Sequence, residues 1–219
     1  RAALTKYKQE MSKLAIEYQQ NLGEEDTKLT FSAEELGGLP EDFLSGLERK
    51  GDDYVVTLAY PHVVPIGRQC EVESTRRAIE KAFNRRCIEK NVAILERLIE
   101  LRHKVAELLG FPTHADFILD IQMAKSTANV RKFLEELSVK LDPLIESELV
   151  ELKKLKGSDT FGMWDMRFFM NKETEAKYDL DQNEVKKYFP LEVVTKGMLD
   201  IYQRLLSLKF VEVADPHVW

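Results

Sequence analysis

Apolar residues recur every three or four positions through most of this chain, and that spacing predicts amphipathic α-helices. The first such stripe comprises Leu4, Tyr7, Met11, Leu14 and Tyr18. Gly23 follows it and is a natural helix stop. Similar stripes return from Ser74 onward. We therefore expect a predominantly α fold made of many helices.

One segment departs from the helical spacing. Residues 54–60 are rich in β-branched and aromatic side chains, and Pro61 follows them. A short extended run also covers residues 28–31. The sequence thus predicts one short β element near residues 54–60, in an otherwise helical chain.

Helix boundaries can be placed from capping boxes, in which two side chains satisfy free backbone donors. Such boxes occur at residues 32–35, 113–116 and 181–184, and each predicts that a helix begins there. Pro143 lies inside a long helical stretch and is expected to kink or divide it.

Two parallel apolar stripes within residues 88–108 predict a helix buried on more than one side. For the chain as a whole we expect two segments, an N-terminal helical one over residues 1–125 with the β element and a second helical one over residues 126–219. Both would be parts of one larger fold.

Charge and cysteine content exclude several classes of protein. Lys and Arg number 32 against 38 Asp and Glu, a formal net charge of −6, so we expect no nucleic-acid partner. No apolar run is long enough for a membrane span, so we expect no membrane partner. Cys70 and Cys87 are too few for a disulfide framework and favour a reducing, cytoplasmic location.

The two ends of the sequence look cut. The chain starts at Arg1 inside a helical pattern, and residues 216–219 end it on a large aromatic side chain. We therefore expect a piece of a longer protein.

No catalytic, metal-binding or cofactor-binding residue is predicted. The four histidines include no pair at the spacing of His-Glu-x-x-His, and no Gly-x-Ser-x-Gly elbow or phosphate-binding loop is present. Glu100 and His103 match half of a di-iron motif, but such sites need a second copy on a facing helix. A di-metal bundle is therefore only a minor alternative.

Cys70 and Cys87 are the only candidates for redox-sensitive side chains. Cys87 follows Arg85 and Arg86, whose charges would lower its pKa if they faced the sulfur, but helical spacing directs them mostly elsewhere. The densest aromatic and methionine cluster, residues 164–170, is typical of a core, with a ligand groove as the alternative.

Several runs, in this order and at these separations, resemble the thimet oligopeptidase and neurolysin family of zinc metallopeptidases. They are Tyr60-Pro61-His62, Thr75-Arg76-Arg77, residues 82–87 (Ala-Phe-Asn-Arg-Arg-Cys), residues 108–117 (Leu-Leu-Gly-Phe-Pro-Thr-His-Ala-Asp-Phe), Met123-Ala124-Lys125, Trp164-Asp165 and Tyr188-Phe189-Pro190. The resemblance extends from about Leu4 to Trp219.

The resemblance implies a largely helical, two-lobed endopeptidase whose deep channel admits short peptides, located in the cytosol and also in mitochondria. In that family, zinc is held by His-Glu-x-x-His and a later glutamate, and a tyrosine and a histidine stabilise the transition state. All of these lie C-terminal to the region matched here. The resemblance therefore implies zinc in the full-length protein, with none bound to this chain.

We thus expect that this chain forms part of the channel wall. We also expect it to be catalytically inactive without the missing C-terminal catalytic part. The activity of this family is also sensitive to thiol chemistry. The resemblance therefore also implies that Cys70 and Cys87 are candidates for redox-sensitive residues. The alternative is a non-catalytic helical module, a truncated paralogue that binds a peptide or protein. A piece of a larger fold would expose apolar helix faces, whereas a stand-alone module would cover them.

Overall fold

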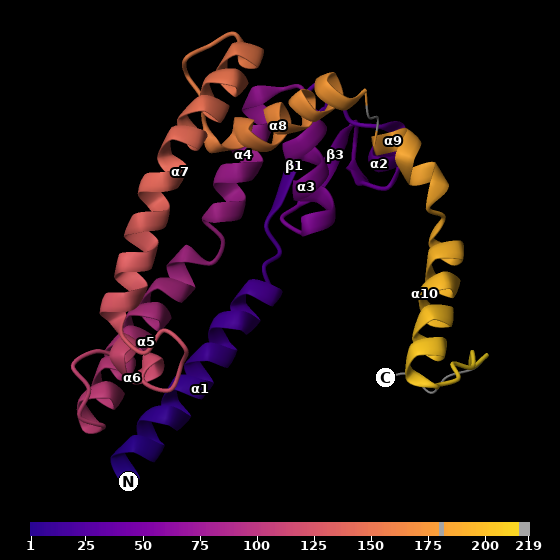
Figure 1. Ribbon diagram of the computed structural model, residues 1–219. Coiled ribbons are helices and arrows are strands. Elements are labelled where there is room, and N and C mark those ends of the chain that lie inside the picture. Colours follow the sequence, from indigo (N-terminus) through magenta and orange to yellow (C-terminus); the bar gives the residue numbers. More distant parts are fainter. Residues whose placement is uncertain (180–181, 215–219) are drawn as a thin grey trace. The chain divides into compact units, whose positions relative to one another are not determined.

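The computed structural model describes residues 1–179 and 182–214 (Figure 1). The chain divides into two compact units, one over residues 1–171 and one that begins at Lys172. Helices dominate both, so the predicted fold class is confirmed. The break expected at residues 125–126 concerns the larger fold and stays a prediction.

The first unit contains most of the elements. Its helices are α1 (Ala2–Gly23), α2 (Glu41–Ser45), α3 (Tyr60–Gln69), α4 (Glu73–Asn84), α5 (Ile88–Leu108), α6 (His114–Leu119) and α7 (Thr127–Lys156), and its strands are β1 (Lys28–Phe31), β2 (Glu48–Lys50) and β3 (Asp53–Thr57). Helix α8 (Met163–Tyr178) crosses the boundary in sequence. The second unit continues with α9 (Gln182–Val185), the 3₁₀ turn η1 (Lys186–Tyr188) and α10 (Leu191–Leu206).

The predicted β element is the central strand of a small antiparallel sheet. The strand order is β1-β3-β2, and Leu29 lies opposite Val56 while Glu48 lies opposite Val55. β1 coincides with the extended run expected at residues 28–31. β2 consists of three exposed charged residues, so the sequence contains no apolar pattern that would predict this strand.

The core of the first unit lies where the sheet meets α2, α3 and α4. Its buried side chains are Phe31, Leu36, Leu39, Leu47, Tyr54, Val56, Val63, Ile66, Cys70 and Ile79. Burying this much apolar surface is the main favourable term in folding the sheet and the three helices together.

Helix α3 was not predicted, because Pro61 was interpreted as the end of the extended segment over residues 54–60. Pro61 falls in the first turn, where a missing N–H costs nothing, whereas Pro65 lies inside the helix. Val63 and Ile66 are buried on its inner face. Tertiary burial therefore outweighs the lost helical hydrogen bond.

The first capping box forms, but the helix expected after it does not. The Ser32 N–H donates to the Glu35 carboxylate at 2.9 Å, and the Glu35 N–H donates to the Ser32 hydroxyl at 3.2 Å. Residues 33–38 are turns. Gly38 has φ +87°, and a Cβ there would lie 2.8 Å from the Gln69 carbonyl oxygen, so the chain must leave the helical path.

The second capping box is confirmed, since the Thr113 hydroxyl accepts from the Asp116 N–H at 3.1 Å at the start of α6. The third lies at residues 181–184. Asp181 and the side chains of residues 182 and 183 are outside the described residues, so that box stays a prediction.

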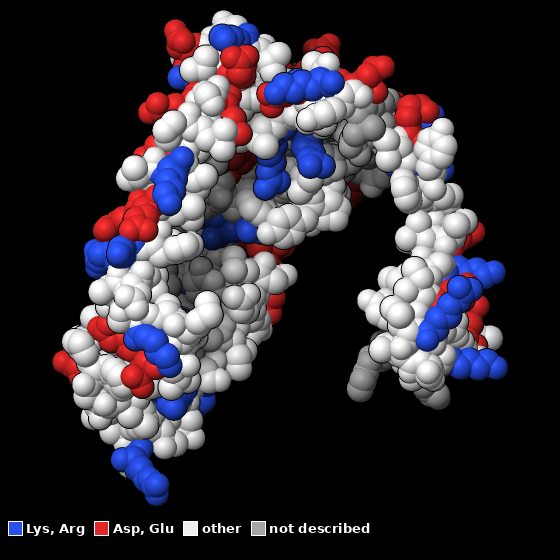
Figure 2. All heavy atoms as spheres, in the orientation of Figure 1, with Lys and Arg blue, Asp and Glu red and all other residues white. Residues whose placement is uncertain are grey.

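Helix α7 is continuous over 30 residues, so Pro143 does not divide it. Gly157 ends it with φ 70°, a left-handed C-cap. Most of its apolar residues are exposed, among them Phe133, Leu134, Leu144 and Ile145. Figure 2 shows basic and acidic side chains interspersed along this helix, with broad uncharged areas between them.

The prediction that α5 is buried on more than one side is wrong for the structure as described. Its first stripe is buried and includes Ile94, Leu98 and Leu101, whereas the second stripe is about half exposed, with Val92 at 46% and Ile99 at 57%. The sequence identified both apolar faces, but only one of them has a partner here.

Helix α1 lies beside α5 (Figure 1). The Arg97 guanidinium donates to the Glu10 carboxylate at 2.8 Å, and the Asn21 amide donates to Asn91 at 2.8 Å. The Asn91 amide in turn donates to the Tyr18 carbonyl. Within the described ranges, no helix is both long and apolar enough to cross a membrane.

We expect the substitution Ile66→Ala to lower the free energy of unfolding by about 2–5 kcal/mol, because it leaves a cavity in a fully buried site. Ile121→Ala is the matched control, since Ile121 is 86% exposed and should cost less than about 0.5 kcal/mol. Urea denaturation followed by far-ultraviolet circular dichroism measures both. Equal effects at the two sites would contradict the assignment of the core.

Candidate functional site

The most elaborate polar arrangement in the first unit is a buried ion network centred on Asp165. Its carboxylate accepts from the Arg76 guanidinium at 2.8 Å and from the Lys156 ammonium at 2.6 Å. The Gly162 N–H donates to the same carboxylate at 3.0 Å. Lys156 also reaches Glu73 at 3.1 Å. The network thereby joins α4, the end of α7 and the start of α8.

Arg76 is fully engaged by this network and by backbone carbonyls. Its guanidinium donates to the carbonyls of Cys70, Glu71 and Trp164 at 2.8, 3.0 and 3.2 Å. It also stacks over the Phe168 ring at 4.2 Å. A buried guanidinium needs such partners, because an unpaired buried charge is very costly.

Burial of Asp165 opposes its ionisation, but the Lys156 ammonium, the Gly162 N–H and the Arg76 guanidinium outweigh burial and lower its pKa. The same carboxylate keeps the pKa of Lys156 above its ordinary value, against the effect of burial. Asp165 and Lys156 are therefore both charged at neutral pH.

Sequence reasoning missed this network. It assigned Arg76 to no site, yet this residue is only 3% exposed. Its partner Asp165 lies 89 residues away, so no local pattern linked the two. The available signal was an aspartate within the aromatic and methionine cluster of residues 164–170.

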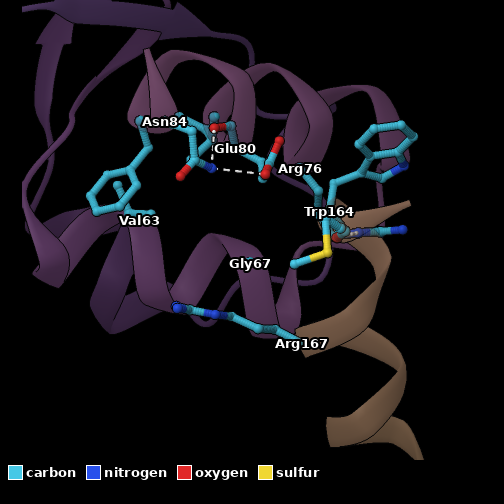
Figure 3. Close-up of a pocket in the computed structure, with 10 residues that line it drawn as sticks. Val63, Gly67, Arg76, Glu80, Asn84, Trp164 and Arg167 are labelled. Atoms are coloured by element: carbon cyan, nitrogen blue, oxygen red, sulfur yellow. Dashed lines mark hydrogen bonds between the residues drawn. The ribbon is translucent and has the colours of Figure 1, made fainter. Parts of the chain in front are cut away.

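A cavity of about 190 Å³ opens beside the network, between α3, α4 and α8 (Figure 3). Arg76 and Trp164 line it, as do Glu80 and Asn84 of α4 and Arg167 of α8. The aromatic and methionine cluster of residues 164–170 was expected to lie in a core or to line a ligand groove. Its members do both, because Phe168 is buried whereas Trp164 lines the cavity.

The first redox candidate, Cys70, is buried at the end of α3. Its thiol donates to the Glu35 carbonyl at 3.4 Å, and burial raises its pKa. The Arg76 charge nearby acts in the opposite direction but does not prevail.

The second candidate, Cys87, sits between α4 and α5 with a left-handed backbone, φ 53°. Its thiol donates to the Asn21 carbonyl at 3.1 Å and to the Glu25 carboxylate at 3.2 Å. Burial and the Glu25 carboxylate raise the pKa of the Cys87 thiol, and the neighbouring Arg86 only weakens that effect. Redox sensitivity of either cysteine stays a prediction.

The described residues do not fit a zinc site, because no three His, Cys, Asp or Glu side chains among them converge. His62 accepts from the Thr57 N–H at 3.0 Å, and His103 lies 3.4 Å from Glu107. Glu100 is bound by Arg97 at 2.7 Å and by Lys104. Glu100 and His103 therefore do not act together. His217 lies outside the described residues.

Comparison with known proteins identifies a family. Residues 67–219 match the sequence model of peptidase family M3. The chain is 35% identical to a probable thimet oligopeptidase of Arabidopsis thaliana, with 100% of the chain and 32% of that protein covered. It is 36% identical to a thimet-like oligopeptidase of Dictyostelium discoideum, with 98% and 35% covered.

A third relative is saccharolysin of Saccharomyces cerevisiae, which is 33% identical with 98% of the chain and 32% of that protein covered. The chain thus spans about a third of the length of these curated relatives.

We expect Asp165→Asn to destabilise the first unit by about 3–5 kcal/mol, because it leaves Arg76 and Lys156 without their buried counter-charge. Asp159→Asn, an exposed carboxylate on the preceding loop, is the control. Urea denaturation compares the two variants. A loss below about 1 kcal/mol at Asp165 would show that the network does not hold these helices together.

Glu25 gives a pH-dependent prediction. Its carboxylate accepts from Thr27 and Cys87, which lowers its pKa from 4.5 to about 2. Because the folded-state pKa is depressed, its stabilisation is fully present above about pH 4.5 and is lost as the pH falls towards 2. The difference in Tm between wild type and Glu25→Gln should shrink over that range.

Glu34→Gln is the matched control, since the Glu34 carboxylate contacts no partner among the described residues. Its Tm should follow that of the wild type at every pH. A pH-independent difference at Glu25 would contradict the assigned role of its charge.

Proposed function

This chain belongs to peptidase family M3, and on that basis we propose that it is the upstream helical part of a zinc-dependent endopeptidase that hydrolyses short peptides. The observation that carries the proposal is the match over nearly the whole chain to oligopeptidases about three times its length. In this proposal the helices form channel wall and scaffold.

The zinc ligands and the catalytic glutamate belong to the C-terminal part of the parent protein. No His-Glu-x-x-His sequence occurs in the 219 residues, and the described side chains provide no alternative metal site. Zinc bound elsewhere in the parent protein would polarise the scissile carbonyl and activate water. In this proposal the residues of this chain form the helical scaffold and take no direct part in the reaction.

The exposed apolar faces support a missing partner. Phe133 of α7 is 63% exposed, and the second stripe of α5 is also uncovered. Contiguous apolar surface of this kind marks contact with further protein. We propose that the partner is the remaining catalytic part of the same peptidase. A stand-alone binding module would cover these faces, so they weigh against that alternative.

The proposed substrates are short peptides, and the proposed location is the cytosol, with mitochondria as a second site. Cys70 and Cys87 are both free thiols, which suits a reducing compartment. The sequence composition gives no attraction to nucleic acid.

We expect the purified chain, with zinc added, not to hydrolyse a quenched fluorescent peptide. The control is a chimaera of the Arabidopsis relative in which this chain replaces the matched third of that protein. The chimaera should show chelator-sensitive hydrolysis, whereas the relative without that third should not.

Two outcomes would contradict the proposal. Chelator-sensitive turnover by the chain alone, after removal of contaminating peptidases, would reveal a metal site within it. A chimaera that is folded and binds zinc but is inactive would show that this chain does not supply the scaffold.

A further inference from the structure

The cavity beside the Asp165 network has a volume of about 190 Å³, smaller than the pockets that bind drug-sized molecules, so only a very small ligand would fit it. Apolar side chains make up much of its lining, contributed by Val63, Ile79, Phe83, Met163 and Trp164. Small-ligand sites combine such a lining with a few placed polar groups. Its polar groups are Arg76, Glu80, Asn84 and Arg167.

Trp164 is held in place before any ligand arrives. Its indole N–H donates to the Glu73 carboxylate at 3.1 Å, and the Arg77 guanidinium lies 4.8 Å from its ring centre. Gly162 approaches so closely that a Cβ there would lie 2.4 Å from the indole. Only glycine at 162 therefore permits this position of the ring. A preformed wall reduces the entropy lost on binding.

The two sides of the cavity carry opposite charges that do not contact each other. Glu80 and Asn84 lie on α4, and Arg167 reaches from α8 along the other side (Figure 3). Asn84 donates to Glu80 at 2.8 Å, which leaves carboxylate and amide oxygens as acceptors. Arg167 makes no hydrogen bond or ion pair within the described part of the chain. Arg76 is already saturated by the network.

Gly67 gives a second, independent reason to expect an occupant. It lies inside α3, where glycine costs roughly 0.5–1 kcal/mol relative to alanine. Nothing in the packing forbids a side chain, because the nearest atom to a Cβ would be the Arg167 Cδ at an ordinary 3.7 Å. The glycine instead keeps the cavity floor open.

We propose that this cavity binds a free apolar α-amino acid. Its ammonium group meets the oxygens of Glu80 and Asn84, its carboxylate meets the Arg167 guanidinium, and its side chain packs on the apolar lining. A zwitterion satisfies both unpaired charges, which a neutral molecule or a simple anion does not. This site goes beyond the proposed peptidase function and does not depend on it.

Isothermal titration calorimetry on the full 219-residue chain tests the proposal, with leucine and phenylalanine as ligands. Leucinamide lacks the carboxylate and N-acetylleucine lacks the ammonium group. We expect saturable binding of both amino acids and affinities lower by about tenfold or more for each derivative, since each loses one charge-assisted contact.

Three variants locate the site. Arg167→Gln and Glu80→Gln each remove one charge and should lower the affinity for leucine by about tenfold or more. Gly67→Leu should abolish binding by filling the floor, while circular dichroism confirms that the helix remains. Arg131→Gln, an exposed arginine of α7 outside the cavity, is the matched control and should bind leucine as the wild type does.

The proposal is overturned if neither amino acid binds saturably, or if leucinamide or N-acetylleucine binds as tightly as leucine. It is also overturned if folded Arg167→Gln and Gly67→Leu variants bind leucine like the wild type, because the ligand would then lie elsewhere. None of these outcomes bears on the peptidase assignment, which the chimaera tests separately.

Discussion

The Asp165 carboxylate is the interaction on which the first unit most depends. It is fully buried, and its guanidinium, ammonium and backbone N–H partners come from three separate parts of the chain. Through Arg76 the network also ties down the carbonyls at the end of α3. The packing of the start of α8 on α4, beside the cavity, depends on this one satisfied charge. A half-satisfied version would be worse than an apolar core.

Local patterns in the sequence were enough to predict the fold class, the central strand, and helices such as α1 and α5. The Ser32 and Thr113 caps were also predictable, because capping depends on neighbours three residues apart. Helix α3 and strand β2 were not. The burial of Val63 and Ile66 outweighs two prolines in α3, and β2 is recruited by backbone pairing with β3.

The candidate site could be predicted only in part. The sequence alone shows that this chain contains no His-Glu-x-x-His motif. The resemblance of the chain to oligopeptidases agrees with the comparisons. The ion pair between Arg76 and Asp165 could not be predicted from the sequence, because no local pattern links these two residues. For Cys87, helical spacing indicated that the adjacent arginines mostly point away from the sulfur, but nothing local revealed Glu25, which lies 62 residues earlier and acts with burial to raise the pKa of the thiol. In both cases tertiary electrostatics decided the outcome.

The pairing of α1 with α5 also has a consequence for synthesis. Asn21 and Asn91 are 70 residues apart, so α1 leaves the ribosome long before α5 exists. At about 5–20 residues per second, that interval lasts several seconds or more. During it the apolar stripe of α1 lacks its partner α5, and exposed apolar surface of this kind makes a nascent chain prone to aggregation.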